Sequence, residues 1–257
     1  MERRRGIDRA VTVHEGCEAR HGFAFGAHYD PANAFFGALL AHNEERLAPG
    51  AGYPRHAHHE ADLVTWVVEG ELQHSDSLGN ARTVRPGTVQ VLSAGTGVEH
   101  AELSAVGTRF VQSWLVPDAL APPELRSRDL SEELASGSPV LVAAGASVDT
   151  FALPAPVRAA EGSPAPERAE QRSVSSPLSL RRADAALWAA RLPAAAVWEL
   201  TPAPFVHVYL AAGSATVPPG EVGEGDELRL TDEGVTLTAG DRGAEVLVWT
   251  MGSDLRP

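Results

Sequence analysis

Residues 56–102 read HAHHEADLVTWVVEGELQHSDSLGNARTVRPGTVQVLSAGTGVEHAE, and their pattern is the strongest indication of the fold class. Short runs rich in β-branched and apolar residues, at 63–68 and 89–92, alternate with glycine-containing turns at 77–80 and 85–87. Such turns terminate strands, and closely spaced strands are typical of an antiparallel sandwich or small barrel. The stretch therefore predicts an all-β fold.

The two ends of this stretch carry side chains that bind metals. His56 and His58 stand two residues apart, as do His100 and Glu102, so each pair shares one face of a strand. If the two strands face each other, three imidazoles and one carboxylate converge, a donor set that suits a divalent transition metal such as Fe(II). The alternative for residues 56–59 is a histidine-containing surface loop. His59 is out of phase and should point away.

Outward from this stretch, the chain divides into two β-rich parts. The first, residues 1–130, continues with a strand at 108–116 and a short helix within 120–135. The second, residues 131–257, contains a Pro/Ala-rich loop at 154–177 that buries little apolar surface. Strand patterns resume at 186–192, 206–210, 214–217, 228–230, 235–238 and 244–251. Similar strand density without a residue-level repeat is typical of a duplicated and diverged barrel.

Composition limits the functions open to the chain. The net charge is −13 over 257 residues and no lysine occurs, so phosphate backbones and anionic membranes are repelled, although residues 1–6 are basic. Cys17 is the sole cysteine, which excludes an internal disulfide and fits the cytoplasm. No apolar run has the length of a signal peptide core or a membrane span. No Gly-x-Ser-x-Gly elbow is present, and Gly95-Thr96-Gly97 is too short for a nucleotide loop.

Further motifs lead to a family resemblance. They include Gly22-Phe23-Ala24-Phe25-Gly26, His28-Tyr29-Asp30-Pro31-Ala32, the segment 64–72, His74-Ser75-Asp76-Ser77-Leu78-Gly79-Asn80 and Ser93-Ala94-Gly95-Thr96-Gly97. Together with the histidine pairs they resemble the pirin family of the cupin superfamily, strongly over about residues 21–118 and weakly beyond. The resemblance implies a bicupin, two antiparallel jelly-roll β-barrels packed face to face.

The resemblance also implies a single metal site. The ligands would be His56, His58, His100 and Glu102 in the first barrel, with iron as the usual metal and Mn, Co, Ni, Cu or Zn as alternatives. The second barrel would lack a metal, since His207, the only histidine after residue 102, is expected to pack. Asp62 stands where many pirins carry glutamate and is expected to accept a hydrogen bond from a ligand imidazole at most. Family members commonly have His-Pro-His-Arg where this chain has His56-Ala57-His58-His59.

Several bacterial pirins are quercetin 2,3-dioxygenases, so the resemblance implies oxidative ring opening of a flavonol with dioxygen. Glu102 would then be both ligand and general base, and Trp66 would lie near the pocket or in the core. The alternative is a non-enzymatic, iron-dependent and redox-sensitive regulator that binds a protein partner, as eukaryotic pirins do. A cupin that has lost activity is a third reading. Pirins are often monomers, which we also expect here.

Overall fold

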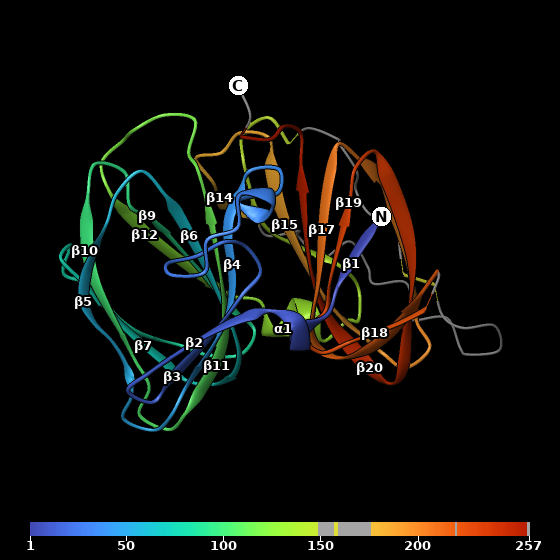
Figure 1. Cartoon of the computed structure of the whole chain (residues 1–257), viewed down its shortest axis with the longest axis horizontal. Coiled ribbons are helices and arrows are strands. Elements are labelled where there is room, and N and C mark those ends of the chain that lie inside the picture. The colour runs from blue at the N-terminus through green and yellow to red at the C-terminus, as the bar shows by residue number, and fades with distance from the viewer. Residues whose placement is uncertain (149–156, 159–175, 219, 256–257) are drawn as a thin grey trace.

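The computed structural model describes residues 1–148, 157–158, 176–218 and 220–255 (Figure 1). These residues form two β-rich halves that lie side by side, which confirms the predicted all-β class. The predicted loop at 154–177 lies outside the described residues except for 157–158 and 176–177, where Arg158 forms a β-bridge with Val197. The division at residue 130 stays a prediction.

The first half consists of two antiparallel sheets that enclose a shared interior. The larger has the strand order β12-β9-β6-β11-β4-β3-β2, and the smaller has the order β5-β10-β7-β8. Burial alternates along several strands, for example β10, as expected when one face of a sheet packs inward. The bounds are β2 Ala10–His14, β3 Cys17–His21, β4 Leu39–Leu47, β5 Gly52–His58, β6 Asp62–Gly70, β7 Leu72–Asp76, β8 Ala81–Val84, β9 Thr88–Ser93, β10 Val98–Leu103, β11 Thr108–Leu115 and β12 Glu124–Asp129.

The second half is one nine-stranded sheet. Its main path runs β1-β19-β17-β20-β15-β13-β14, with β16 on β20 and β18 on β17. Buried apolar side chains from β15 to β20 fill its interior. The bounds are β1 Glu2–Arg4, β13 Val140–Ala144, β14 Leu178–Ser179, β15 Ala185–Leu192, β16 Val197–Ala203, β17 Phe205–Val217, β18 Gly220–Gly223, β19 Glu227–Leu230 and β20 Glu233–Met251.

Two strands are longer than the sequence pattern predicts. The runs 206–210 and 214–217 form the single strand β17, and 235–238 and 244–251 form the single strand β20. The register between them shifts at Gly213, where the chain bends without leaving the sheet. Gly213 has a φ of 75°, and a Cβ there would lie 2.2 Å from the carbonyl oxygen of Gly243. The glycines at this bend therefore permit a bulge rather than a chain break.

Helices are few and short in the ranges that the structure describes. They are the 3₁₀ turns η1 Gly6–Asp8 and η2 Pro31–Asn33 and the helix α1 Ser131–Leu134. The predicted helix within 120–135 is thus one turn long, and residues 124–129 form the edge strand β12 against β9 instead. Among the described residues, no helix has both the length and the apolar character to cross a bilayer.

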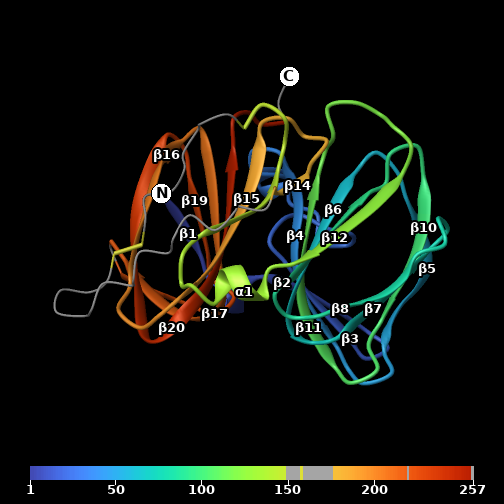
Figure 2. The ribbon, with the colours of Figure 1, turned by 180° about the vertical axis from the view of Figure 1, so that it is seen from behind.

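The N-terminal strand crosses into the other half. β1 pairs with β19, with Glu2 opposite Arg229, and both views show the two strands together (Figures 1 and 2). Just after β1, the backbone of Gly6 packs directly against the backbone of Gly225, since a Cβ at Gly6 would lie 2.7 Å from the carbonyl carbon of Gly225. The Gly6 N–H also donates to Asp226 Oδ1 at 2.9 Å. The basic start of the chain is therefore fixed at the junction of the halves.

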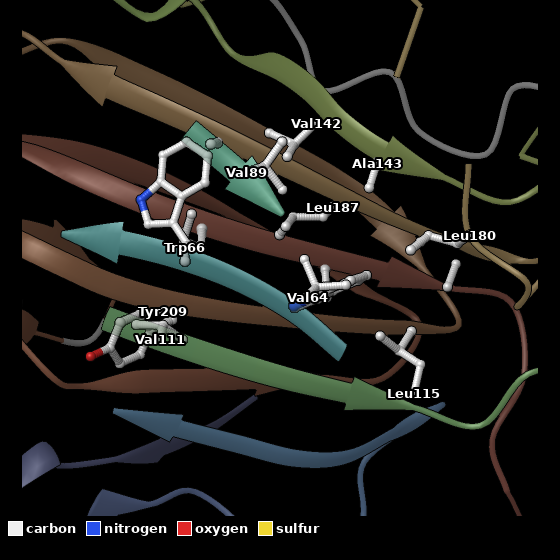
Figure 3. Packing of buried hydrophobic residues seen from close by; sticks show 14 of the residues in the cluster. Val64, Trp66, Val89, Val111, Leu115, Val142, Ala143, Leu180, Leu187 and Tyr209 are labelled. Carbon is white, nitrogen blue, oxygen red and sulfur yellow. The ribbon is translucent and has the colours of Figure 1, made fainter. Parts of the chain in front are cut away.

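A continuous apolar core joins the two halves. The larger sheet of the first half contributes Val64 and Val111, and the second half contributes Leu187 and Tyr209 (Figure 3). Trp66 lies in this core, 1% exposed, and its indole N–H donates to Glu245 Oε1 across the junction at 2.7 Å. Of the two places expected for Trp66, the structure thus assigns it the core. Burial of apolar area across the junction favours association of the halves.

Trp66 provides a test of this shared core. We expect Trp66→Ala to lower the free energy of unfolding by about 3–5 kcal/mol, because it leaves a cavity and removes the indole donor of Glu245 Oε1, while Oε2 keeps its bond from Arg191. Urea unfolding followed by circular dichroism measures the change. Leu78→Ala, at a site 44% exposed, is the control and should change the stability by less than about 0.5 kcal/mol. Equal effects of the two substitutions would contradict the assignment of Trp66 to the core.

Candidate metal centre

Strands β5 and β10 bring three histidines together inside the first half. The two strands are antiparallel neighbours, with His100 opposite His56 and Val98 opposite His58. The ring centroids are 4.5 Å apart for His56 and His100, 4.8 Å for His56 and His58, and 4.9 Å for His58 and His100. One nitrogen from each ring lies within 4.8 Å of the others, close enough to ligate one ion after small rotations.

Glu102 meets a second, overlapping group. Its carboxylate lies within 4.8 Å of a nitrogen of His100 and of His74, which stands opposite Glu102 on β7. Both groups share His100, so the structure brings the four predicted residues into one region and adds His74. The sequence alone did not assign a role to His74, although the alternation in His74-Ser75-Asp76 gives it the same phase as the ligand pairs.

The hydrogen bonds separate His74 from the predicted ligands. His74 is bonded on both sides: its Nε2 lies 3.1 Å from Asp76 Oδ2, and its Nδ1 lies 3.3 Å from the Gln90 amide nitrogen. In contrast, within the described part of the chain, His58 Nε2 and both nitrogens of His100 are buried without a hydrogen-bond partner. Buried imidazole nitrogens without hydrogen-bond partners are suited to act as metal ligands.

The electrostatics keep these imidazoles neutral. Burial, together with the smaller effect of the neighbouring His56, lowers the pKa of His58 to about 4 and that of His100 to about 2. Only a neutral imidazole has a lone pair for a metal. The Nε2 lone pair of His56 is available to a metal, because the Nδ1–H donates to the carbonyl oxygen of Pro54 at 2.8 Å.

Two residues of β11 orient Glu102 and His58, and the sequence reasoning missed both. The Gln112 amide donates to both oxygens of Glu102 at 3.1 Å, and its own oxygen accepts from the Trp114 indole N–H at 2.8 Å. The Trp114 ring meets His58 edge-on, with centroids 4.9 Å apart. Burial raises the pKa of Glu102 to about 7, and the bonds from Gln112 act against this shift.

A second buried carboxylate lies beside this group. Glu45 on β4 is 7% exposed and accepts from the Tyr53 hydroxyl at 2.5 Å. The pKa of Glu45 is raised to about 8. Burial is the main cause and the charge of Glu102 adds to it, while the hydrogen bond from Tyr53 acts in the opposite direction. Two carboxyl groups with raised pKa values near histidines are typical of a site that handles protons.

Other sequence expectations have mixed outcomes. The side chain of His59 is 74% exposed beside Glu60, as expected from its phase. The expectation for Asp62 is wrong: its Oδ2 accepts from the Arg181 backbone N–H at 2.6 Å, and its Oδ1 has no hydrogen-bond partner in the described ranges. Asp62 begins β6 beside the second half, so it faces the junction rather than the histidines.

His207 packs at the junction in a third group of candidate ligands. It is fully buried, with His42 and Glu227 within 4.8 Å. Its Nε2 donates to Glu227 Oε2 at 2.8 Å, while Arg9 and Arg229 occupy the same carboxylate at 3.0 and 2.9 Å. Two guanidinium groups on the one carboxylate repel a cation, so this group is a poor metal site.

The fold and this histidine cluster are those of a cupin-type protein with two antiparallel β-sheet halves, and comparisons identify the family. The sequence pattern of the Pirin family matches residues 4–115. A Mycobacterium tuberculosis protein named "Putative quercetin 2,3-dioxygenase" is 35% identical over 260 residues, covering 99% of this chain and 96% of that protein. The chain therefore belongs to the pirin family.

Other known proteins agree on the fold. The Escherichia coli K12 "Quercetin 2,3-dioxygenase" is 34% identical over 118 residues, 45% of this chain and 51% of its own length. The crystal structure of the E. coli bacterial pirin YhhW in complex with nickel(II) superimposes with a TM-score of 0.80 and 24% identity, covering 98% of this chain and 99% of that one. This likeness confirms the predicted bicupin.

Glu45 predicts how stability changes with pH. Its folded pKa of about 8 lies above the ordinary value of 4.5, so between these values the folded chain holds a proton that the unfolded chain releases. Stability from this group is thus complete below pH 4.5 and lost as pH rises through 8. We expect the free energy of unfolding of Glu45→Gln to be about 1–3 kcal/mol higher than that of the parent protein at pH 8.5 and equal to it at pH 5.

Urea unfolding of chelator-treated protein at both pH values measures this difference. Glu69→Gln is the matched control, because that side chain is 68% exposed and should leave the pH dependence unchanged. A stability gain of Glu45→Gln that is the same at both pH values would show that Glu45 is not held protonated in the fold.

Proposed function

We propose that the chain is a metal-dependent dioxygenase that opens a flavonol such as quercetin at the cluster of His56, His58, His100 and Glu102. The observation that carries the proposal is the cluster of three imidazoles, in which His58 Nε2 and both nitrogens of His100 are buried without a hydrogen-bond partner among the described residues. The nickel in the similar E. coli pirin and the dioxygenase names of the relatives support the same class. The compartment that we propose is the cytoplasm.

Fe(II) is the metal that we propose, since three imidazoles and one carboxylate suit a borderline ion. When bound, it would supply the Lewis acidity and the dioxygen chemistry of the reaction. The protein would contribute one negative charge through Glu102, leaving a site of net charge of about plus one that attracts a deprotonated hydroxyl. The residues present therefore fit the metal that the family implies.

The residues around the cluster divide the remaining work. Glu102 would take the proton of the flavonol 3-hydroxyl as a general base; without the metal, burial raises the pKa of this carboxyl to about 7. Gln112 holds the carboxylate in place through both oxygens. Phe25 and Trp114, whose rings meet edge-on at 5.3 Å, offer aromatic faces for a planar substrate.

Metal content tests the ligand set. We expect protein purified without added metal to carry about one ion per chain, and His58→Ala and Glu102→Ala to lose most of it because each removes a donor. Elemental analysis measures the content. His59→Ala is the matched control, since the neighbouring side chain is 74% exposed and should keep the ion. Full metal content in His58→Ala would rule out this site.

Turnover tests the reaction. The iron-loaded protein should consume quercetin absorbance only in the presence of dioxygen and release carbon monoxide. With kcat expressed per bound iron, Glu102→Gln should lower it by at least about 10²-fold through loss of the general base, while His59→Ala keeps the parent rate. If iron-loaded protein shows no oxygen-dependent loss of quercetin, the enzyme proposal fails. The alternative, a redox-sensitive regulator, then predicts a protein partner whose affinity changes with oxidant.

A further inference from the structure

A cavity of about 340 Å³ lies at the junction of the two halves, apart from the metal centre. The segment 4–10 lines one side, residues 21–33 line another, and Glu227 of β19 contributes from the second half. As far as the structure describes the chain, no lining residue comes from β5 or β10, which carry the predicted ligands. The basic start of the sequence, otherwise without a role, borders this cavity.

The buried charge beside the cavity is unbalanced. Arg9 and Arg229 are 3% and 4% exposed, and both bind the carboxylate of Glu227, which is fully buried. Burial lowers the pKa of His207, which leaves this third partner of Glu227 neutral. The cluster therefore holds two positive charges against one negative charge. A buried charge without a counter-charge is costly.

Neighbouring acidic groups do not remove this excess. Asp8 lines the cavity, but its side chain is 71% exposed and faces Arg5 at 3.9 Å. Asp30 also lines it, is exposed, and accepts the backbone N–H of Ala32. Glu44, reached through Tyr209, is already paired with Arg46 and Arg109. The buried excess near the cavity is thus positive.

Arg9 also has unused hydrogen-bond donors. Only its Nη2 is bonded, to Glu227, and its Nε and Nη1 are buried with no hydrogen-bond partner anywhere in the described ranges. A buried donor without an acceptor costs free energy comparable to a lost hydrogen bond. An anion in the adjoining cavity would compensate the charge and bring acceptor oxygens within reach after a small shift of the side chain.

The walls indicate what the rest of the ligand is like. Phe23 and Tyr29 line the cavity together with the imidazole of His21. The volume lies in the range of small-molecule sites, which combine aromatic walls with a few polar anchors. Arg4, whose Nε donates to Glu2 at 2.9 Å, and Arg5, which faces Asp8 at 3.9 Å, are 32% and 63% exposed at the rim, where their other guanidinium N–H groups match the geometry of a carboxylate. We propose that this junction cavity binds a small aromatic carboxylate.

Calorimetric titration of the full chain tests the proposal with benzoate as the probe. Benzamide is the neutral control of the same shape, and inorganic phosphate is the control for oxyanions in general. We expect saturable benzoate binding at least about tenfold tighter than benzamide or phosphate, because only benzoate combines charge with an aromatic ring. Arg4→Gln with Arg5→Gln should weaken benzoate severalfold. Arg85→Gln, with a side chain 59% exposed beside Glu71, should not.

Two further measurements separate this site from the metal centre and from misfolding. Benzoate binding should persist after chelation and in His58→Ala, even if the proposed dioxygenase activity is absent. Arg9→Gln should abolish binding if its melting curve shows a folded protein; if it does not fold, the double rim variant decides. Equal binding of benzamide, tighter binding of phosphate, rim variants that behave like Arg85→Gln, or loss of binding with chelation would each overturn the proposal.

Discussion

The structure depends on one sheet that is buried on both faces. Along β11, Gln112 and Trp114 point into the first half toward Glu102 and His58, while Val111 and Leu115 pack in the core shared with the second half. Because successive strand residues face opposite sides, a shift of one residue would exchange the two sets. The residues that orient the candidate site are therefore held by the same register that joins the halves.

The sequence predicted what depends on local spacing. The two-residue interval in His56-Ala57-His58 and in His100-Ala101-Glu102 was sufficient to place each pair on one face, and the pairing of β5 with β10 then brings three imidazoles together. The sequence could not show which other strands lie beside these two. Gln112 and His74 come from β11 and β7, and their contacts with this region depend on tertiary pairing that no interval encodes.

The failures have similar causes. Asp62 was assigned to the histidines because many pirins carry glutamate at its place in the motif, yet it lies where β6 meets the second half and binds the backbone of Arg181. Strands β17 and β20 were each divided in two because turn-type residues interrupt their patterns, although a glycine bulge lets the ladder continue. The place of a residue in a sequence motif is a weak guide to its contacts where strands distant in sequence supply the neighbouring groups.

The chain contains two clusters of the same residue types, and their neighbours decide what each can bind. Around His100, uncharged imidazoles and the carboxylate of Glu102 offer lone pairs to a cation. Around His207, two guanidinium groups act on one carboxylate, so the region can accept an added negative charge. The two regions are connected by rings: His21, at the cavity, stacks on Phe25, which meets Trp114, which meets His58. Aromatic contacts therefore run without a break from the junction cavity to the candidate metal ligands.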